Sequence, residues 1–430
     1  MSALDTYDQT VHSLKGTVRG RAAAVIGNGL EYYDFTLYAF FAAIIGKNFF
    51  PADSELGSLF LSVAVFGVGF LARPLGAVII GSYADRRGRK PAMLLTMALM
   101  AIGILAIIVT PPYAVIGIAA PIIIVIARLL QGFAWGGESG PITSFLVESA
   151  PHNKRGYYAS WQVASQGLAV LFAGTAGVVT SSLMTPEMMT AWGWRIPFVL
   201  GLAIVPVGYF LRNKLEDTAE AAPEVKSTQI VSSVLFRYTG TTLLCVMVLI
   251  PGTVTVYVNN YMTSYALTIL HLPITLSISI NMAVGATMMV AALVSGMLSD
   301  RFGRKPVMLL PCLGLMLVAI PAFTWLSSST GTLAVFAVPI LLATLTGLHV
   351  GGVISGVPEA FPKAIRSTGV SMTYALAATV FGGSTQFVVT WLLSATGNPT
   401  SPAWWIVGAC VIGLCGMLMF KETADASLKE

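Results

Sequence analysis

Apolar stretches of about 20 residues or more recur along this sequence from end to end, and they limit what the chain can fold into. Each is long enough to cross the roughly 30 Å hydrocarbon core of a bilayer as an α-helix. Only 10% of the 430 residues are charged and 56% are hydrophobic, whereas about 25% are charged in an average soluble protein. Only helices and closed barrels satisfy the backbone in lipid, and these stretches exceed a barrel strand in length. The sequence therefore predicts an all-α integral membrane protein.

The hydropathy pattern predicts twelve transmembrane helices. We place them at residues 22–46, 57–82, 91–110, 119–145, 157–183, 192–212, 236–267, 273–299, 307–327, 331–358, 367–394 and 402–420. The first 21 residues carry charges and lack the short apolar core and small-residue cleavage site of a removable signal peptide. We therefore expect them to remain as a cytoplasmic N-terminal segment.

Lysine and arginine are distributed unevenly over the predicted loops, and loops rich in these residues stay cytoplasmic. With the N-terminus inside, all but four of the 24 basic residues lie on the cytoplasmic side. The exceptions are Lys47 and Arg195 outside, and Arg73 and Arg128 within spans. We expect a multi-pass protein of the cell (inner) membrane with both termini in the cytoplasm. The net charge of +5 then faces anionic lipid headgroups of the bilayer, and we expect no nucleic-acid partner.

One loop sequence occurs twice. GSYADRRGRKP begins at position 81 and GMLSDRFGRKP at position 296, which is 215 residues later and half the chain length. A second pair, VESAPHNKRG and VPEAFPKAIRSTG, places Glu148 and Glu359 211 residues apart. We expect two six-helix pseudo-repeats. The predicted domains are a cytoplasmic N-terminal segment at 1–21, an N-terminal bundle at 22–212, a cytoplasmic linker at 213–235, a C-terminal bundle at 236–421 and a cytoplasmic tail at 422–430.

The repeated loops have a mechanical interpretation as gates. Asp85 and Asp300 can each cap the N-terminus of an adjacent helix, or pair across the interface of the halves with Arg89 and Arg304 respectively. We assign Glu148 and Glu359 to the same gating contacts. Such contacts would brace the outward-open state until substrate binding breaks them. The alternative is that the basic residues serve only to set the topology.

The two-half architecture and the G-x-x-x-D-R-x-G-R-K loop in both halves resemble the major facilitator superfamily over essentially the whole chain. GNGLEYYDF, FPADSELGSL, RLLQGFAWGGESG and WGWRIPF look like its metabolite:proton symporter branch, whose members carry organic acids or zwitterions with protons. Within that branch, SWQVASQ and SPAWW resemble citrate and tricarballylate carriers. The resemblance implies alternating access, in which two halves rock about a site near the midplane of the membrane.

Two carboxylates, Glu31 and Asp34, lie in the first span. Three-to-four spacing places them on one helix face with Asn28 and Tyr38. At about 1.5 Å per residue, Glu31 lies ~15 Å into the membrane. A carboxyl group at that depth is costly to keep ionised and takes up a proton easily. We therefore expect Glu31 and Asp34 to take part in proton coupling; the alternative for Asp34 is a cap on a local polar network.

Arg73, in FLARPLG of the second span, lies at a depth similar to that of Glu31. Its guanidinium offers a planar fork of donors suited to a carboxylate and remains charged at physiological pH. We expect Arg73 to pair with Glu31, and an anionic substrate to replace that carboxylate once Glu31 or Asp34 is protonated. The alternative is a fixed Arg73–Glu31 pair that only joins two helices.

The fourth span carries Arg128, Gln131 and Trp135 on one face, with Glu138 nearer the cytoplasm. RLLQG matches the superfamily's R-x-x-x-G element, whose arginine is implicated in proton transfer. We assign Arg128 to anion attraction or coupling and Glu138 to coupling; the alternative for both is a buried pair. Small residues in this span predict close helix contacts, namely Gly132, Gly136 and Gly140.

Neutral polar side chains in other spans are candidate substrate contacts. Tyr158, Gln162 and Gln166 recur every four residues in the fifth span, where the alternative is hydrogen bonding between helices. The seventh span offers Tyr257, Asn259, Asn260 and Tyr261. The predicted substrate-binding set is Arg73, Tyr33, Arg128, Gln131, Gln162, Gln166, Tyr257, Asn260 and Tyr374. His349 titrates in a useful range, and its alternative is a hydrogen-bonded packing residue.

Several classes of function have no candidate residues. Cys245, Cys312, Cys410 and Cys415 lie in spans without metal-ligand spacing, and no G-x-x-x-x-G-K-[ST] sequence offers an ATP site. We expect no enzyme, no metal and no cofactor.

The sequence predicts a monomeric secondary active transporter that performs proton-coupled symport of a small organic anion, a di- or tricarboxylate such as citrate, by alternating access. The proton gradient is the expected driving force. The alternatives are a proton symporter of a zwitterionic osmolyte such as betaine or proline, and a non-transporting nutrient sensor on the same scaffold.

Overall fold

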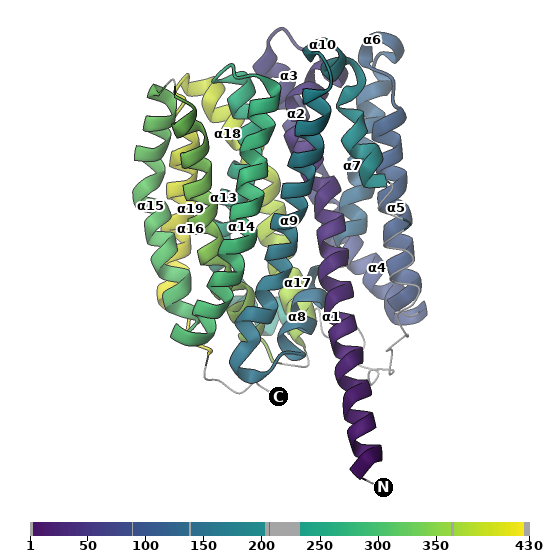
Figure 1. The fold of residues 1–430 in the computed structure, drawn as a ribbon, viewed down its shortest axis with the longest axis vertical. Coiled ribbons are helices and arrows are strands. Elements are labelled where there is room, and N and C mark those ends of the chain that lie inside the picture. Colours follow the sequence, from purple (N-terminus) through teal and green to yellow (C-terminus); the bar gives the residue numbers. More distant parts are fainter. Residues whose placement is uncertain are drawn as a thin grey trace.

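The computed structural model describes residues 3–87, 89–136, 139–202, 206, 233–329, 331–362 and 365–424. All regular elements in these ranges are helices, and Figure 1 shows the longest of them running side by side. Along parts of some helices, among them residues 3–20, 84–87 and 89–90, only the backbone is described. The prediction of an all-α protein is confirmed for the described residues.

The first half of the chain begins with α1 (Ala3–Phe40), which starts well before the predicted span 22–46 and extends beyond the rest of the bundle in Figure 1. The elements that follow are α2 (Ala42–Phe49), α3 (Glu55–Leu71), α4 (Arg73–Arg87), α5 (Arg89–Val109), α6 (Tyr113–Ile116), α7 (Ala119–Gly136), α8 (Ser139–Glu148), η1 (His152–Lys154), α9 (Arg155–Ser182), α10 (Pro186–Met188) and η2 (Met189–Gly193). Residues 195–202 are also helical.

The second half contains longer uninterrupted helices. Its elements are η3 (Ser233–Arg237), α13 (Thr239–Thr268), α14 (Ile274–Phe302), α15 (Arg304–Ser328), α16 (Thr332–Glu359), α17 (Arg366–Ala377), η5 (Ala378–Gly382), α18 (Gly383–Thr396) and α19 (Ser401–Met419). Most of the predicted linker 213–235 and of the predicted span 192–212 lies outside the described residues.

Nine helices or joined helices in the described ranges are long and apolar enough to cross a membrane. Their bounds agree with nine of the predicted spans to within a few residues, except that span 119–145 is divided between α7 and α8. Two more predicted spans coincide with shorter or joined helices. The span at 22–46 falls on α1 and α2, and the span at 91–110 falls on α5, whose apolar part is Leu94–Val109.

Some predicted spans are interrupted rather than continuous. The span at 57–82 breaks at Ala72, between α3 and α4. Pro74, the second residue of α4, has no N–H and therefore cannot form a backbone hydrogen bond back to the last turn of α3. The span at 367–394 contains the π-helical turn η5 between α17 and α18. Such local irregularities in transmembrane helices are not visible in a hydropathy pattern.

The two halves contact each other along whole helices. In Figure 1 the first half, in purple to teal, lies beside the second half, in green to yellow, with α9 against α14. A Cβ on Gly167 of α9 would lie only 2.6 Å from the backbone nitrogen of Met289 in α14. Helices in lipid associate through such close packing of small residues. The contact therefore depends on glycine at this position.

The start of α1 and the segment that follows α19 lie at one end of the bundle, which we call the terminal end (Figure 1). The α8–α9 and α14–α15 turns also lie there, whereas α6 and α10 lie at the opposite end. The second repeated loop and both copies of the Glu-containing sequence are therefore gathered at the terminal end.

Candidate functional site

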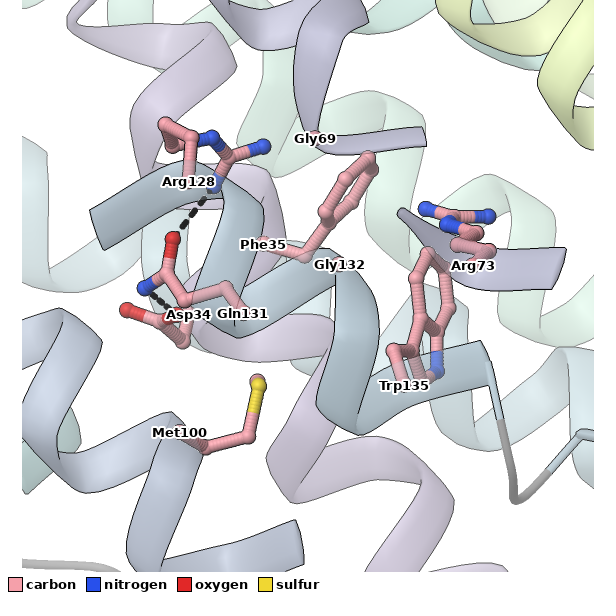
Figure 2. Close-up of a pocket in the computed structure, with 9 residues that line it drawn as sticks. All are labelled: Asp34, Phe35, Gly69, Arg73, Met100, Arg128, Gln131, Gly132 and Trp135. Atoms are coloured by element: carbon pink, nitrogen blue, oxygen red, sulfur yellow. Dashed lines mark hydrogen bonds between the residues drawn. The ribbon is translucent and has the colours of Figure 1, made fainter. Parts of the chain in front are cut away.

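A small cavity lies within the first half, between helices α1, α3, α4, α5 and α7. Figure 2 shows the side chains around it converging from these helices. It combines three charged side chains with aromatic rings. The lining residues are Asp34, Phe35, Gly69, Arg73, Met100, Arg128, Gln131, Gly132 and Trp135.

Asp34 and Arg128 are connected through the side-chain amide of Gln131. Arg128 Nη1 donates to Gln131 Oε1 at 2.8 Å, and Gln131 Nε2 donates to Asp34 Oδ2 at 2.8 Å (Figure 2). An arginine only donates and an ionised carboxylate only accepts, so the two neighbours fix the orientation of the amide. The buried Asp34 Oδ1 has no hydrogen-bond partner among the described residues. The local polar network considered for Asp34 is present, and its function stays a prediction.

Aromatic rings surround the guanidinium of Arg73. Its central carbon lies 3.7 Å from the ring centres of both Phe70 and Trp135. The hydroxyl of Tyr257, from α13 of the second half, also interacts with it. The predicted Arg73–Glu31 pair is absent from the ion pairs of the described residues. Phe35, one helical turn after Glu31, occupies the side of α1 that faces this guanidinium, and Glu31 does not line the cavity.

Arg73 and Arg128 are 6% and 2% exposed, and within the described part of the chain neither forms a direct ion pair with a carboxylate. Phe35 lies between them (Figure 2), with its ring centre 5.3 Å from the guanidinium carbon of Arg73 and 5.4 Å from that of Arg128. Cation–π contacts of roughly 0.5–2 kcal/mol offset only part of the cost of burying such charges. The two buried guanidinium groups would therefore be stabilised by an anion in the cavity.

Glycines bring the two arginine-bearing regions together. A Cβ on Gly132 would clash with the carbonyl oxygen of Gly69, and one on Gly136 would clash with that of Arg73. Helix α7 thus contacts α3 and α4 backbone to backbone, which places Arg128 and Arg73 around one cavity. The packing role predicted for Gly132 and Gly136 is seen here; the surroundings of Gly140 are not described.

A second cavity lies between the halves, lined by residues of α1, α9, α13 and α14. Its polar lining residues are Tyr32, Gln166, Asn259 and Asn260. Asn259 Oδ1 and Asn260 Nδ2 are buried without hydrogen-bond partners in the described part of the molecule. The ring of Tyr32 lies 6.2 Å from that of Trp135, so this tyrosine is next to a residue that lines the first cavity. Gln166 and Asn260 of the predicted set therefore face a shared space.

Two predicted substrate contacts are engaged in interhelical hydrogen bonds. Gln162 Oε1 accepts from Thr143 Oγ1 at 2.7 Å, and the hydroxyl of Tyr33 donates to the carbonyl of Pro197 at 3.1 Å. Neither residue lines either cavity. For Gln162 the structure favours the alternative of interhelical hydrogen bonding.

Three other polar candidates lie away from the cavities. Tyr374 is packed against the apolar core of the second half. Nδ1 of His349 lies 2.8 Å from the carbonyl oxygen of Met308, which favours its interpretation as a packing residue. The ring of Tyr158 lies 4.3 Å from the guanidinium carbon of Arg21, near the terminal end.

The second repeated loop forms an ion network at the terminal end. Arg304 holds Glu359 with two bonds, Nη2 to Oε1 at 2.9 Å and Nε to Oε2 at 3.1 Å. Its Nη1 lies 2.9 Å from Oδ1 of Asp300. We expected the Asp300–Arg304 pair to cross the interface of the halves. It lies within the second half instead, because both residues flank the same α14–α15 turn.

Asp300 crosses the interface as a helix cap. Its Oδ1 accepts from the backbone N–H of Gly156 at 2.7 Å and its Oδ2 from that of Tyr157 at 2.8 Å. These N–H groups belong to the first turn of α9, where they lack acceptors within the helix. A capping carboxylate is typically worth about 0.5–2 kcal/mol. The helix cap expected of Asp300 is therefore present and joins the halves.

Two ionic contacts cross the interface in a reciprocal arrangement. Glu148 of the first half lies 2.8 Å from Nη1 of Arg366, and Glu359 of the second half lies 4.0 Å from Nη1 of Arg155. Each arginine follows the glutamate of its own sequence copy by seven residues. We did not single out Arg155 and Arg366, although both belong to the basic clusters that mark the second repeated pair.

The side chains of three predicted residues lie outside the described part of the structure. Glu138 lies outside the described residues. Asp85 and Arg89 lie on α4 and α5, where only their backbone is described. The gating role of the first repeated loop stays a prediction.

Known proteins are similar to this chain over most of its length. The Major Facilitator Superfamily profile matches residues 24–383. The chain is 36% identical over 404 residues to a citrate-proton symporter of Klebsiella pneumoniae, covering 93% of this chain and 91% of the relative. It is 34% identical over 426 residues to a proline/betaine transporter of Escherichia coli strain K12, covering 95% and 84%.

Solved structures with the same fold have much lower sequence identity. The crystal structure of a D-xylose-proton symporter superposes with a TM-score of 0.78 at 17% identity, covering 95% of this chain and 99% of that one. An inward-open structure of the xylose transporter from E. coli gives a TM-score of 0.74 at 18% identity, covering 96% and 98%. The matching profile, the two curated relatives and the shared fold together show that the chain is a multi-pass membrane protein that belongs to the Major Facilitator Superfamily.

Proposed function

We propose that this protein is a secondary active transporter that carries a small organic anion across the membrane together with protons. The observation that carries the proposal is the pair of buried guanidinium groups, Arg73 and Arg128, around one cavity without a direct carboxylate partner among the described residues. A pair of helices that needed only to be joined would neutralise such charges, because an unpaired buried charge is costly. An anion in the cavity supplies the missing partner.

The proposed substrate is a di- or tricarboxylate, with citrate as the first candidate. Each guanidinium presents a planar fork that suits one carboxylate. Two forks on opposite sides of Phe35 therefore suit an anion with more than one carboxylate. Gln166, Asn259 and Asn260 offer neutral donors and acceptors in the neighbouring cavity. The similarity to a citrate-proton symporter supports the same class of substrate.

Asp34 is the proposed proton carrier, with Glu31 and Glu138 as further coupling candidates. Through Gln131, the charge of ionised Asp34 offsets that of Arg128. Protonation of Asp34 removes this negative charge and makes the cavity more favourable for an anion. A proton and an anionic charge that load together leave the net charge of the cavity unchanged, which couples their movements.

Transport requires the two halves to move relative to each other. The cavity around Arg73 and Arg128 measures about 10 Å³, which is room for one water molecule and too little for a di- or tricarboxylate. We infer that the contacts at the terminal end open and close during alternating access. We further propose that the terminal end is cytoplasmic, that the protein resides in the cell (inner) membrane, and that it acts as a monomer of two six-helix bundles.

A zwitterionic osmolyte such as betaine or proline is the second candidate substrate. It is supported by the similarity to a proline/betaine transporter and by the aromatic rings around the cavity, which are typical of sites for organic cations. The guanidinium of Arg73 already covers the rings of Phe70 and Trp135. A substrate ammonium would have to compete with this fixed cation, so the anion remains the favoured substrate.

The test is uptake of radiolabelled citrate into proteoliposomes that contain the purified protein, with and without an inward proton gradient. Unlabelled succinate, 2-oxoglutarate, tricarballylate and betaine are added as competitors. Uptake that depends on the gradient and is blocked by tricarballylate supports both coupling and substrate class. Uptake blocked by betaine alone favours the zwitterion, and citrate uptake that ignores the gradient contradicts proton symport.

A further inference from the structure

The segment that follows α19 lies on the ion network of the terminal end. Glu422 Oε1 accepts from the backbone N–H of Arg304 at 2.9 Å, and its Oε2 accepts from that of Lys305 at 3.0 Å. These are the first two residues of α15, and the N-cap position before them is Gly303, which has no side chain to cap the helix. Glu422 therefore caps α15 from a segment that is more than 100 residues away in sequence.

The glycine of the repeated loop leaves room for this carboxylate. Gly303 has a φ of +95°, a conformation that L side chains rarely adopt, and a Cβ on it would lie only 2.8 Å from Oε2 of Glu422. The loop geometry and the position of Glu422 are therefore matched to each other.

Thr423 contacts the acidic partner in the same network. Its Oγ1 donates to Glu359 Oε2 at 2.7 Å, the oxygen that also accepts from Arg304 Nε. The other oxygen of Glu359 faces Arg155 of the first half. Glu422 and Thr423 thus hold the backbone of Arg304 and the carboxylate of Glu359 at once. We call this pair of residues the bracket.

The bracket carries its charge at neutral pH. Burial alone would raise the pKa of Glu422, but four backbone N–H groups donate to its carboxylate and hold the pKa below its usual range. The contribution of a carboxylate with a lowered pKa is fully present above its ordinary value and is lost only as pH falls through the lowered one. Protonation at neutral pH therefore does not release the bracket.

We propose that Glu422 and Thr423 are positioning residues of the gate at the terminal end. They act through Arg304 and Glu359, which they hold in position for the contacts with α9 and Arg155 of the first half. The bracket lies wholly within the second half, so it stays formed when the halves separate, whereas the contacts of Asp300 with α9 and of Glu359 with Arg155 break. Its loss disfavours the closed arrangement while each half keeps its fold. This inference rests on alternating access as proposed above and does not depend on the substrate.

The experiment measures how often the interface at the terminal end opens. The reporter is Ala159→Cys, a fully buried position of α9 that packs between the halves against Ala292 and Ile354. The four native cysteines are replaced by alanine, and the full chain is labelled with a maleimide in detergent, where both ends are accessible. Glu422→Gln and Thr423→Val are each expected to raise the labelling rate about five- to tenfold, the change that loss of a charge-assisted cap or hydrogen bond produces. Unchanged rates in both variants overturn the proposal.

Matched controls separate gating from loss of the fold. Glu187→Gln and Thr396→Val make the same changes at exposed positions of the opposite end and are expected to leave the rate unchanged. In a second background only Cys312, which is fully buried within the second half, is retained. Labelling of Cys312 that rises in step with the reporter indicates unfolding and also overturns the proposal. Citrate takes no part, so failure of the substrate assignment leaves this test intact.

Discussion

Arg73 and Arg128 flank the same ring of Phe35, yet their polar neighbours differ. Arg128 is connected to Asp34 through Gln131, whereas Arg73 meets aromatic rings and a tyrosine hydroxyl from the other half. We therefore propose different roles for the two arginines: Arg128 responds to protonation of Asp34, whereas Arg73 binds the substrate. Arg73 is also the arginine in contact with Tyr257 of α13, so it is placed to register movement of the second half.

Replacement of Arg73 tests its role as the anion anchor. Arg73→Lys keeps the charge but loses the planar fork, and we expect gradient-driven uptake to fall about 10- to 100-fold, as for loss of a charged hydrogen bond of about 1.5–3 kcal/mol. Arg73→Ala should abolish uptake. The matched control is Arg195→Lys, an arginine that binds the carbonyls of Ile108 and Thr110 away from the cavity. Near-normal uptake by Arg73→Ala would exclude the anchor role.

Replacement of Asp34 tests proton coupling. Asp34→Asn keeps the shape and the acceptor for Gln131 but resembles the protonated side chain at every pH. We expect it to retain exchange of labelled for unlabelled substrate and to lose acceleration by an inward proton gradient. Glu31→Gln, assayed in parallel, decides which carboxylate of α1 carries the proton. A variant whose uptake keeps the wild-type dependence on the gradient does not contain the proton carrier.

At the scale of elements, the contact of α7 with α3 is the feature that sets the geometry of the cavity. Gly132→Ala should force the helices apart, because its Cβ would clash with the carbonyl oxygen of Gly69. We expect a loss of about 1–3 kcal/mol of stability and loss of uptake. The control is Gly408→Ala in α19, where a Cβ would meet no atom within 4 Å. Melting temperatures and uptake of the two variants are compared. Equal values for both would show that the α7–α3 contact does not set the geometry of the cavity.

Hydropathy and spacing predicted the long elements well and their irregularities poorly. The bounds of α13 to α16 follow from apolar length, which the bilayer dictates. The break at Ala72 lies two residues before Pro74, and we read the FLARPLG sequence only for its arginine. The start of α1 at Ala3 was missed because a helix that continues into water carries no hydropathy signal.

The candidate site was predictable in its residue types but not in its pairings. Helical spacing placed Arg128, Gln131 and Trp135 on one face, and all three line the cavity with Asp34. Spacing within one helix does not fix the rotation of α1 relative to α4, which decided that Phe35 rather than Glu31 faces Arg73. For the same reason, the sequence could not predict hydrogen bonds between helices, such as the one between Thr143 and Gln162.

At the scale of the whole molecule, the two halves are joined by a reciprocal pair of ionic contacts. Glu148 contacts Arg366, and Arg155 approaches Glu359, so each copy of the repeated sequence supplies a glutamate to the arginine of the other. Both contacts require the halves to be close at the terminal end. The repeat therefore encodes an interface between its two copies as well as a common fold.

A charge exchange at Glu148 and Arg366 tests this interface. Glu148→Arg alone places two cations together and is expected to open the terminal end, raising maleimide labelling at Ala159→Cys and lowering uptake. Glu148→Arg with Arg366→Glu restores an opposite pair and should recover a closed interface at least in part. Arg366→Glu alone completes the double-mutant cycle, and a double variant as open as the sum of the two single variants would show that the two residues do not interact.

The position of Glu422 and Thr423 has a practical consequence for purification and structure determination. We expect an affinity tag or fusion partner on the C-terminus, which is only a few residues beyond Glu422 and Thr423, to compete for space with the residues that cap α15 and so to enrich molecules that are open at the terminal end. A handle on the N-terminus sits instead on the part of α1 that extends beyond the bundle, far from that contact (Figure 1). The choice of tagged terminus is therefore expected to select which conformation of this transporter is captured.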